Sequence, residues 1–453
     1  MKSGEIDPGA SLFKKQLESL SKINPIRVEG RVAQVLGLVV ESDGPAARLG
    51  EVCLIATGQE TPPLAAEVVG FRGDRLLLMP LGDMNGIRPG SEVVATGRPL
   101  SVSVGESLLG RVLDGLGRPI DGGPTLRNLA RIPVEGAPPN PLLRQRIHSP
   151  LPLGIRALDG LLTCGRGQRL GIFAGSGVGK STTLGMIARN TAAEMNVICL
   201  VGERGREVRD FLERDLGPEG LARSVVVVAT SDQPALQRIK CALVATAIAE
   251  YFRDQGRDVV LMMDSVTRFA MAQREVGLAI GEPPATKGYT PSVFAVLPRL
   301  LERAGTGRAG SITGLYTVLV EADDFNEPIS DAVRGILDGH VILSRELAAQ
   351  NHYPAIDILQ SVSRVMPDIT SEEQRAAAGW LREALATYKN AQDLINIGAY
   401  QRGSNSQIDL ALELQDPIRA YLRQAVEEQV PFERAVQDLE AIFQPYTSTQ
   451  QGP

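Results

Sequence analysis

The residues with the clearest chemistry form a glycine-rich stretch within the 453-residue chain. Gly175, Gly177 and Gly179 stand at every second position, and Lys180 and Ser181 follow at once. Glycine lets the backbone curl so that its N–H groups point at phosphate oxygens, and a helix that starts directly after the loop adds partial positive charge. A lysine at this position reaches the β- and γ-phosphates of a nucleoside triphosphate, and the hydroxyl after it holds Mg²⁺. The stretch therefore predicts a P-loop.

The elements on either side of this loop agree with that prediction. Leu170–Phe173 is an apolar run typical of a buried strand, and Leu184, Met186 and Ile187 share one face of a helical pattern. Strand, glycine loop and helix is the layout of a P-loop. One position departs from the strict pattern, because Ala174 stands where glycine is expected. Alanine fits there only at negative φ, which the exit from a strand permits.

Two acidic residues follow apolar runs of their own. Glu203 comes just after Val197–Val201, and Asp264 ends the run from Asp258. In a parallel sheet the carboxyl ends of the strands form the ligand-binding edge. Glu203 at that edge would orient the attacking water, although position alone equally favours a carboxylate that stabilises a helix start. Asp264 fits the acid that meets Mg²⁺ through its water shell.

Two later residues have weaker signals. Arg364 follows the last predicted strand among small residues, where it could complete the site of a neighbouring subunit. An ordinary surface arginine is the simpler interpretation. Tyr353 could stack on a base, but a tyrosine in such a pattern is more often a core residue.

Composition narrows the classes of protein. Lys and Arg number 47 and Asp and Glu 53, which gives a net charge of −6, and aromatic residues make up 4%. Nucleic-acid-binding domains are usually basic and stack bases on aromatic rings, so nucleic acid is not an expected partner. The polar N-terminus and the lack of a long apolar run predict neither a secretory signal nor a membrane span. The four cysteines lack metal-ligand spacing and are expected to be buried thiols in a reducing compartment.

The hydrophobic periodicity changes along the chain. Residues 1–24 show one apolar helical stripe, which either packs on its own domain or binds a partner. Residues 25–97 carry short β-rich runs that predict a small antiparallel barrel, and residues 98–150 predict a connector that packs on the next domain. Up to residue 367, strands alternate with long helices, which predicts a parallel sheet covered on both faces. Residues 368–453 are predicted to be helical.

Individual strands and helices can be predicted within these segments. The predicted sheet strands are Leu170–Phe173, Val197–Val201, Ser224–Ala229, Val259–Met263, Ile312–Val320 and Val341–Ser344. The predicted C-terminal helices are Glu372–Asn396, Pro417–Glu428 and Phe432–Phe443.

Several motifs together resemble the flagellar export ATPases, which are related to the virulence type III secretion ATPases and to the catalytic head of the rotary ATP synthase. The resemblance covers nearly the whole chain and is strongest over residues 150–367. It implies an α/β fold: a RecA-like P-loop ATPase core with an N-terminal β-barrel domain and a C-terminal helical domain. The motifs that carry it are Gly165–Ser181, Gly202–Glu207, Met263–Glu275, Gly281–Tyr289, Leu297–Ala304 and His352–Asp357.

The same resemblance implies roles for individual residues. Glu203 matches the carboxylate that activates water, Arg204 beside it a contact to the γ-phosphate, and Arg364 an arginine finger supplied to the neighbouring subunit. The expected cofactors are ATP and Mg²⁺, with Ser181 as a metal ligand and Asp264 acting through water. The nucleotide-binding residues are expected to be Gly175, Ser176, Gly177, Val178, Gly179, Lys180, Ser181, Thr182 and Tyr353, and the catalytic ones Glu203, Lys180, Arg204 and Arg364.

The resulting hypothesis is an ATP-hydrolysing homohexamer that promotes unloading and export of flagellar substrates. It would work in the cytoplasm, at the cytoplasmic face of the inner membrane or at the flagellar base. Its expected partners are stator and stalk proteins, an export gate, and substrates with their chaperones. Residues 1–24 are the candidate stator site. The alternatives are a virulence secretion ATPase, a rotary synthase subunit that needs a second subunit type, an RNA translocase and a non-catalytic scaffold. The acidic balance of charge weighs against RNA.

Overall fold

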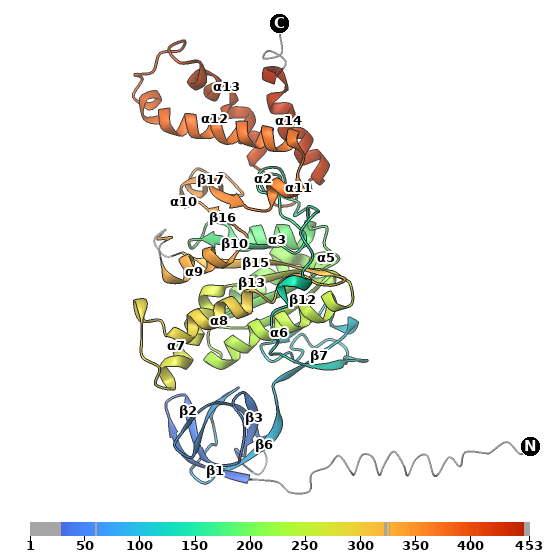
Figure 1. The fold of residues 1–453 in the computed structure, drawn as a ribbon, viewed down its shortest axis with the longest axis vertical. Helices are drawn as coiled ribbons and strands as arrows, with labels where there is room; N and C mark the ends of the chain where they lie inside the picture. Colours follow the sequence, from blue (N-terminus) through green and yellow to red (C-terminus); the bar gives the residue numbers. More distant parts are fainter. Residues whose placement is uncertain (1–28, 59–60, 321–323, 326, 448–453) are drawn as a thin grey trace, which may run out of the picture. The chain divides into compact units, whose positions relative to one another are not determined.

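The computed structural model describes residues 29–58, 61–320, 324–325 and 327–447 (Figure 1). The chain divides into two compact units, Met1–Pro99 and Leu100–Pro453. The N-terminal helix expected over residues 1–24 lies outside the described residues. Within the described ranges, no helix combines the length and the hydrophobicity that crossing a bilayer requires.

The first unit is a closed antiparallel barrel, as predicted, with strand order β1-β2-β5-β4-β3-β6. Gly37 and Gly73 make the tight turns of two hairpins at φ of 57° and 59°, a region that glycine enters without steric cost. Inward-pointing apolar residues such as Val32 and Leu78 form the core. The strands are β1 (Glu29–Leu36), β2 (Val39–Asp43), β3 (Glu51–Ile55), β4 (Leu64–Arg72), β5 (Arg75–Pro80) and β6 (Glu92–Pro99).

The second unit is built around a nine-stranded sheet with the order β17-β16-β10-β15-β13-β11-β12-β8, and β14 pairs with β15. All neighbours are parallel except at β17 and β14. The inner strands are almost wholly buried, which explains their near-continuous apolar sequence. The strands are β8 (Val112–Asp114), β10 (Arg169–Ala174), β11 (Met195–Val201), β12 (Ser224–Ala229), β13 (Asp258–Asp264), β14 (Gly305–Thr306), β15 (Ser311–Leu319), β16 (Gly339–Leu343) and β17 (Ile356–Ser363).

Both edges of this sheet differ from the prediction. β8 comes from the segment predicted as a connector, and its three residues are too few for a periodic signal. At the other edge β17 runs antiparallel to β16, so the expectation that the last strand ends near Ser344 was wrong. Gln360, Ser361 and Ser363 interrupt the apolar pattern of β17, although Gln360 alone of the three is exposed and both serines are buried. A separate ribbon pairs β7 (Ser101–Val104) with β9 (Ala130–Pro133).

Helices cover the two faces of the sheet. α6, α7 and α8 lie on one side, and α3 and α5 lie on the other (Figure 1). This arrangement confirms the predicted α/β layering. The helices of this part are α2 (Arg156–Leu161), α3 (Lys180–Asn190), α4 (Gly205–Asp210), α5 (Gly217–Ala222), α6 (Ala235–Asp254), α7 (Val266–Ala279), α8 (Pro291–Leu301), α9 (Pro328–Ile336), α10 (Arg345–Ala349) and α11 (Met366–Ile369).

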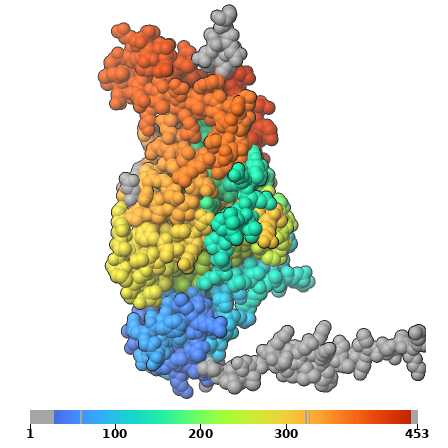
Figure 2. Space-filling view, viewed as in Figure 1, coloured from blue at the N-terminus to red at the C-terminus, as the bar shows by residue number. Residues whose placement is uncertain are grey.

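The C-terminal segment is helical, as predicted, and shares its core with the sheet domain. α12 (Glu372–Asn396), α13 (Ser406–Leu422) and α14 (Phe432–Thr447) contribute to the same apolar cluster as β10 and α3. Figure 2 shows their side chains, in orange and red, lying directly against those of residues 330–370. The prediction that the second of these helices begins at Pro417 was wrong. Asn405 caps the helix through its side-chain oxygen, and Pro417 lies inside it.

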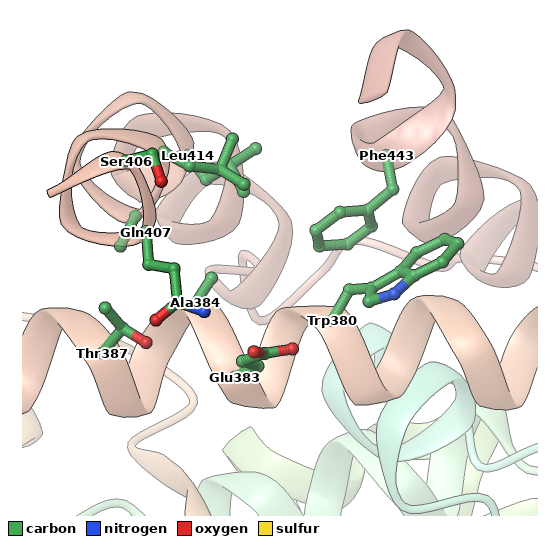
Figure 3. Close-up of a pocket in the computed structure, with 10 residues that line it drawn as sticks. Trp380, Glu383, Ala384, Thr387, Ser406, Gln407, Leu414 and Phe443 are labelled. Carbon is green, nitrogen blue, oxygen red and sulfur yellow. The ribbon is translucent and has the colours of Figure 1, made fainter. Parts of the chain in front are cut away.

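A groove lies between the three C-terminal helices (Figure 3). Its volume is about 370 Å³, and Trp380 and Phe443 lie at one end with ring centroids 5.8 Å apart. Glu383 is the one charged residue among the described residues that line it. The groove therefore offers apolar surface and little chemistry.

A buried ion pair stabilises the helix layer beneath the sheet. Arg303 is 2% exposed, and its guanidinium forms two hydrogen bonds to Glu250, with Nε–Oε1 at 2.9 Å and Nη2–Oε2 at 2.5 Å. A third hydrogen bond runs from Arg303 to the carbonyl of Val134, at 2.9 Å. The bidentate geometry neutralises the buried charge and ties the segment after β9 to α6.

We expect Glu250→Leu to lower the free energy of unfolding by about 3–5 kcal/mol, because it leaves the Arg303 guanidinium buried without a counter-charge. Urea unfolding followed by circular dichroism measures this. The matched control is Glu106→Leu, which removes an exposed partner of Arg257 and should cost about 0–1 kcal/mol. Equal losses in the two variants would contradict the structural role of the buried pair.

Candidate active site

The glycine-rich loop begins where β10 leaves the sheet. Ala174 is still part of that strand, paired with Leu319 on one side and Leu343 on the other, so alanine is accommodated there as expected. Gly177 and Gly179 have φ of 79° and 91°, where a side chain would be strained. Helix α3 starts at Lys180, directly after these two glycines. The loop therefore presents backbone N–H groups and a helix N-terminus to the same space.

Lys180 lies between the two acids singled out in the sequence. Its Nζ contacts Oδ1 of Asp264 and lies 3.6 Å from Oε1 of Glu203. Lys180 and Glu203 follow β10 and β11, and Asp264 is the last residue of β13. The carboxyl ends of these parallel strands meet at one edge of the sheet. All three side chains are at most 16% exposed. Thr317 on the intervening β15 donates a hydrogen bond of 2.7 Å to Oδ1 of Asp264 and so fixes that carboxylate.

The close approach changes the acidity of these groups. Burial raises the pKa of Glu203 to about 7; Lys180 partly offsets this effect and the negative charge of Asp264 adds to it. Burial lowers the pKa of Lys180, but the carboxylates of Asp264 and Glu203 outweigh that effect and hold it above its usual value. Glu203 is thus a carboxylate whose proton affinity suits a general base near neutral pH.

A cavity of about 680 Å³ opens over this cluster. Both basic and acidic side chains line it, in contrast to the apolar groove between the C-terminal helices. Its lining residues are Ala174, Gly175, Ser176, Gly177, Gly179, Lys180, Ser181, Thr182, Gly202, Glu203, Arg204, Glu207, Arg214, Asp215, Thr267, Arg268, Met271, Leu319, Val320 and Arg345.

Most of the predicted nucleotide-binding residues line this cavity. Val178 does not, because its side chain is 1% exposed in the core, so it can offer only its backbone to a ligand. Arg204 lies in the lining with its side chain 76% exposed, 3.6 Å from Glu207. Tyr353 is not a core residue, since it is 41% exposed. Its ring borders the loop: a Cβ built on Gly179 would lie 3.6 Å from it.

The sequence analysis missed Arg268, which lines the cavity in the first turn of α7. Its aliphatic stem packs against Gly202, where any added Cβ would approach it to 3.0 Å. Its Nε has no hydrogen-bond partner among the described residues. The sequence signal that could have identified Arg268 is its position four residues after Asp264, the acid that ends β13. Arg345, at the start of α10, was missed because nothing in its local sequence indicates a site.

Arg364 lies far from this cavity within its own chain. β17 is antiparallel to β16, and Ser363 pairs with Gly339 at the beginning of β16, whereas the loop follows the opposite end of β10. The backbone N–H of Arg364 donates to the carbonyl of Asp338, at 3.0 Å. The six residues of β10 span about 20 Å, so Arg364 lies at the other edge of the sheet from Lys180.

The oxygen atoms near Lys180 suit magnesium. Ser181 offers a hydroxyl and Asp264 a carboxylate, and hard cations such as Mg²⁺ prefer such oxygen ligands. In the described part of the chain, no group of three or more His, Cys, Asp or Glu residues could hold a metal. Two protein ligands with the remainder from phosphate and water is the usual pattern for Mg²⁺. The four cysteines are free and buried, as predicted.

The chain matches three family descriptions in succession. Residues 32–97 match the ATP synthase alpha/beta family beta-barrel domain, residues 154–363 its nucleotide-binding domain, and residues 370–441 the T3SS EscN ATPase C-terminal domain. These matches agree with the barrel, sheet and helical parts of the structure.

Individual proteins are similar over almost the whole length. The flagellum-specific ATP synthase of Bacillus subtilis is 56% identical over 91% of this chain and 94% of its own. The type 3 secretion system ATPase of Xanthomonas euvesicatoria is 52% identical over 91% of this chain and 93% of its own. The solved structure of the assembled ATPase EscN from the enteropathogenic E. coli type III secretion system has a TM-score of 0.85 at 46% identity, covering 91% of this chain and 99% of that one. EscN has also been solved in complex with its central stalk EscO.

The raised pKa of Glu203 predicts the pH dependence of turnover. The ratio kcat/KM reports groups of the free enzyme, and a general base must be ionised to act. Because the pKa of Glu203 is about 7, kcat/KM for ATP should rise as the pH increases through about 7 and level off above it. Steady-state hydrolysis between pH 5.5 and 9 measures this.

Glu203→Gln is the control for this profile. It should lose turnover and the pH step together while still binding nucleotide, because the amide cannot take a proton. An unchanged pH step in this variant would assign the titration to another group.

Proposed function

Since the chain belongs to the family of flagellum-specific ATP synthases and type 3 secretion system ATPases, within the ATP synthase α/β family, we propose that it drives the export of flagellar proteins as a ring of six identical subunits. The chain is a P-loop ATPase. The observation that carries the proposal is the division of the site: Lys180, Glu203 and Asp264 meet at one edge of the sheet, and Arg364 lies at the other.

The residues of one chain prepare ATP for attack. The loop N–H groups bind the phosphates, and Lys180 exchanges its contact with Asp264 for the β- and γ-phosphates, whose negative charge competes for the same ammonium group. Asp264, through water, and Ser181 would then hold Mg²⁺, which would supply positive charge to the phosphate oxygens. Glu203 orients the attacking water and draws on its proton, and Arg204 contacts the γ-phosphate from the rim.

The second half of the site comes from the neighbouring subunit. Arg364 is exposed and cannot reach the loop of its own chain, but a head-to-tail contact around a ring brings each Arg364 to the next subunit's cavity. An arginine there stabilises the charge of the transition state and contributes about 10³–10⁵ in rate. Tyr353 borders the loop at the place where an adenine ring would stack.

The flagellar assignment is supported by the 56% identity to the Bacillus subtilis protein. Virulence secretion is the second candidate, because the Xanthomonas protein is 52% identical. The structure of EscN with its central stalk supports a stalk protein as a partner. We further propose a stator protein, an export gate and substrate–chaperone complexes as partners, and a location in the cytoplasm at the inner membrane.

Mixed assemblies test the shared site. Arg364→Ala alone should bind ATP normally and turn over slowly. When it is mixed with Glu203→Gln, activity should return, because intact cavities of the first variant receive Arg364 from the second. Equal amounts that assemble at random restore about a quarter of the sites. If the mixture is no more active than its two parents, Arg364 does not act between subunits.

Genetic complementation tests the biological role. The gene should restore swimming to a flagellated bacterium that lacks its own export ATPase, and Lys180→Ala should not, because it lacks the phosphate-binding ammonium group. Swimming distance in soft agar measures the effect. Restoration of virulence secretion in a matching deletion strain, without restoration of swimming, would favour the second candidate.

A further inference from the structure

Buried polar groups hold the backbone on both sides of Arg364. The side-chain amide of Gln168 donates from Nε2 to Oγ of Ser363, at 3.0 Å, and to the carbonyl of Asp338, at 3.3 Å. Ser363 is the residue before Arg364, and the Asp338 carbonyl is the atom that receives the Arg364 N–H. Gln168 is fully buried and Ser363 is 7% exposed. One amide group therefore fixes both anchors of the arginine.

Gln168, Ser363 and Asp338 each make further hydrogen bonds. Oε1 of Gln168 accepts the N–H of Gly165 at 2.8 Å, and the Ser363 hydroxyl donates to the carbonyl of Thr163 at 2.8 Å. The carboxylate of Asp338 accepts three hydrogen bonds from Arg169, through its backbone N, Nε and Nη2, at 3.0–3.1 Å. Breaking the hydrogen bonds of Gln168 and Ser363 would leave buried polar groups without partners, and this cost restricts the alternative arrangements.

The network continues into the C-terminal helices. Gln374, in the first turn of α12, donates to the hydroxyl of Thr163 at 3.0 Å, and it is 3% exposed. Arg382, further along the same helix, donates to the carbonyls of Ile358 and Ser361 in β17, at 2.7 and 3.2 Å. β17, which ends one residue before Arg364, is thus held both by Gln168 and by α12.

We propose that Gln168 and Ser363 are positioning residues that set the place of Arg364 for the neighbouring subunit's site. This inference rests on the proposed function, since it assumes that Arg364 acts between subunits. Gln168 comes directly before β10, and the P-loop follows the other end of that six-residue strand. One strand therefore connects the loop that holds a subunit's own nucleotide with the anchor of the arginine that the subunit donates.

Ser363→Ala tests the proposal with little change in volume. It removes the hydroxyl that joins Gln168 to the strand and leaves Arg364 itself intact. Because small misplacements of a catalytic group are costly, kcat should fall about 10–100-fold. The KM for ATP should stay within about twofold, because the subunit's own cavity is untouched.

Mixed assemblies separate positioning from general damage. Ser363→Ala mixed with Glu203→Gln should regain turnover, since the intact cavities of the first variant then receive a correctly held Arg364 from the second. Ser363→Ala mixed with Arg364→Ala should not, because neither variant donates a well-placed arginine. Loss of stability alone would reduce activity in both mixtures alike.

Ser224→Ala is the matched control. Ser224 is also buried, donates to a backbone carbonyl (Gly220, 2.6 Å) and accepts from a side-chain amide (Asn196, 3.2 Å), but it lies on β12, remote from Arg364 in the sheet. Its kcat should stay near that of the wild type. Gln168→Leu is the second variant, and where it assembles it should repeat the mixing pattern of Ser363→Ala.

The outcomes distinguish this inference from the proposed function. Rescue of Arg364→Ala by Glu203→Gln, together with no rescue of Ser363→Ala, would overturn the positioning role alone. Wild-type turnover by Ser363→Ala would also overturn it. Failure to rescue Arg364→Ala would overturn the shared site, and this inference with it.

Discussion

The contact of Lys180 with two carboxylates is the interaction on which the site depends. Asp264 and Glu203 are both largely buried, and two buried negative charges so close together are unfavourable unless a cation lies between them. Lys180 supplies that cation. The pKa of Lys180 depends on both carboxylates, and the pKa of Glu203 depends on Lys180 and Asp264, so the three groups are electrostatically coupled.

This contact requires a particular order of strands. The three residues lie at the carboxyl ends of β10, β11 and β13. These strands are not consecutive neighbours, since β15 lies between β10 and β13. β15 contributes Thr317, whose hydroxyl holds Asp264 toward Lys180. Parallel strands place all of these carboxyl ends at one edge, where helix N-termini also gather. The sheet topology thus brings Lys180, Glu203 and Asp264 together, which no local sequence pattern can specify.

The two ends of β10 lie next to different parts of the molecule. β10 leads into the P-loop at one end and begins next to Gln168 at the other, where the buried network reaches Arg364. α12 contacts that network through Gln374, and it also forms one wall of the apolar groove between the C-terminal helices. The C-terminal helices therefore contact the strand that precedes Arg364, and they also form a groove of their own.

By itself, the sequence determined the layered fold, the barrel and the P-loop. These depend on local features, namely apolar periodicity, turn glycines and the order of glycines before Lys180. Glu203 and Asp264 could be found in the same way, because each comes at the end of a long apolar run. The local sequence gave only weak signals for Arg364 and Tyr353, and the resemblance to a known family was needed to favour them.

Only the tertiary structure decided which groups meet. Arg268 and Arg345 reach the cavity from helices whose sequences carry no phosphate-binding pattern. β17 escaped prediction because two of its buried residues are serines that also bond to distant residues. Ser361 accepts the backbone N–H of Ile342 in β16, and Ser363 accepts from Gln168. Gln168 is likewise fully buried, and one of its hydrogen-bond partners, Ser363, lies 195 residues further along the chain. Contacts between residues far apart in the sequence form only when the whole chain folds, so a local sequence pattern cannot predict them.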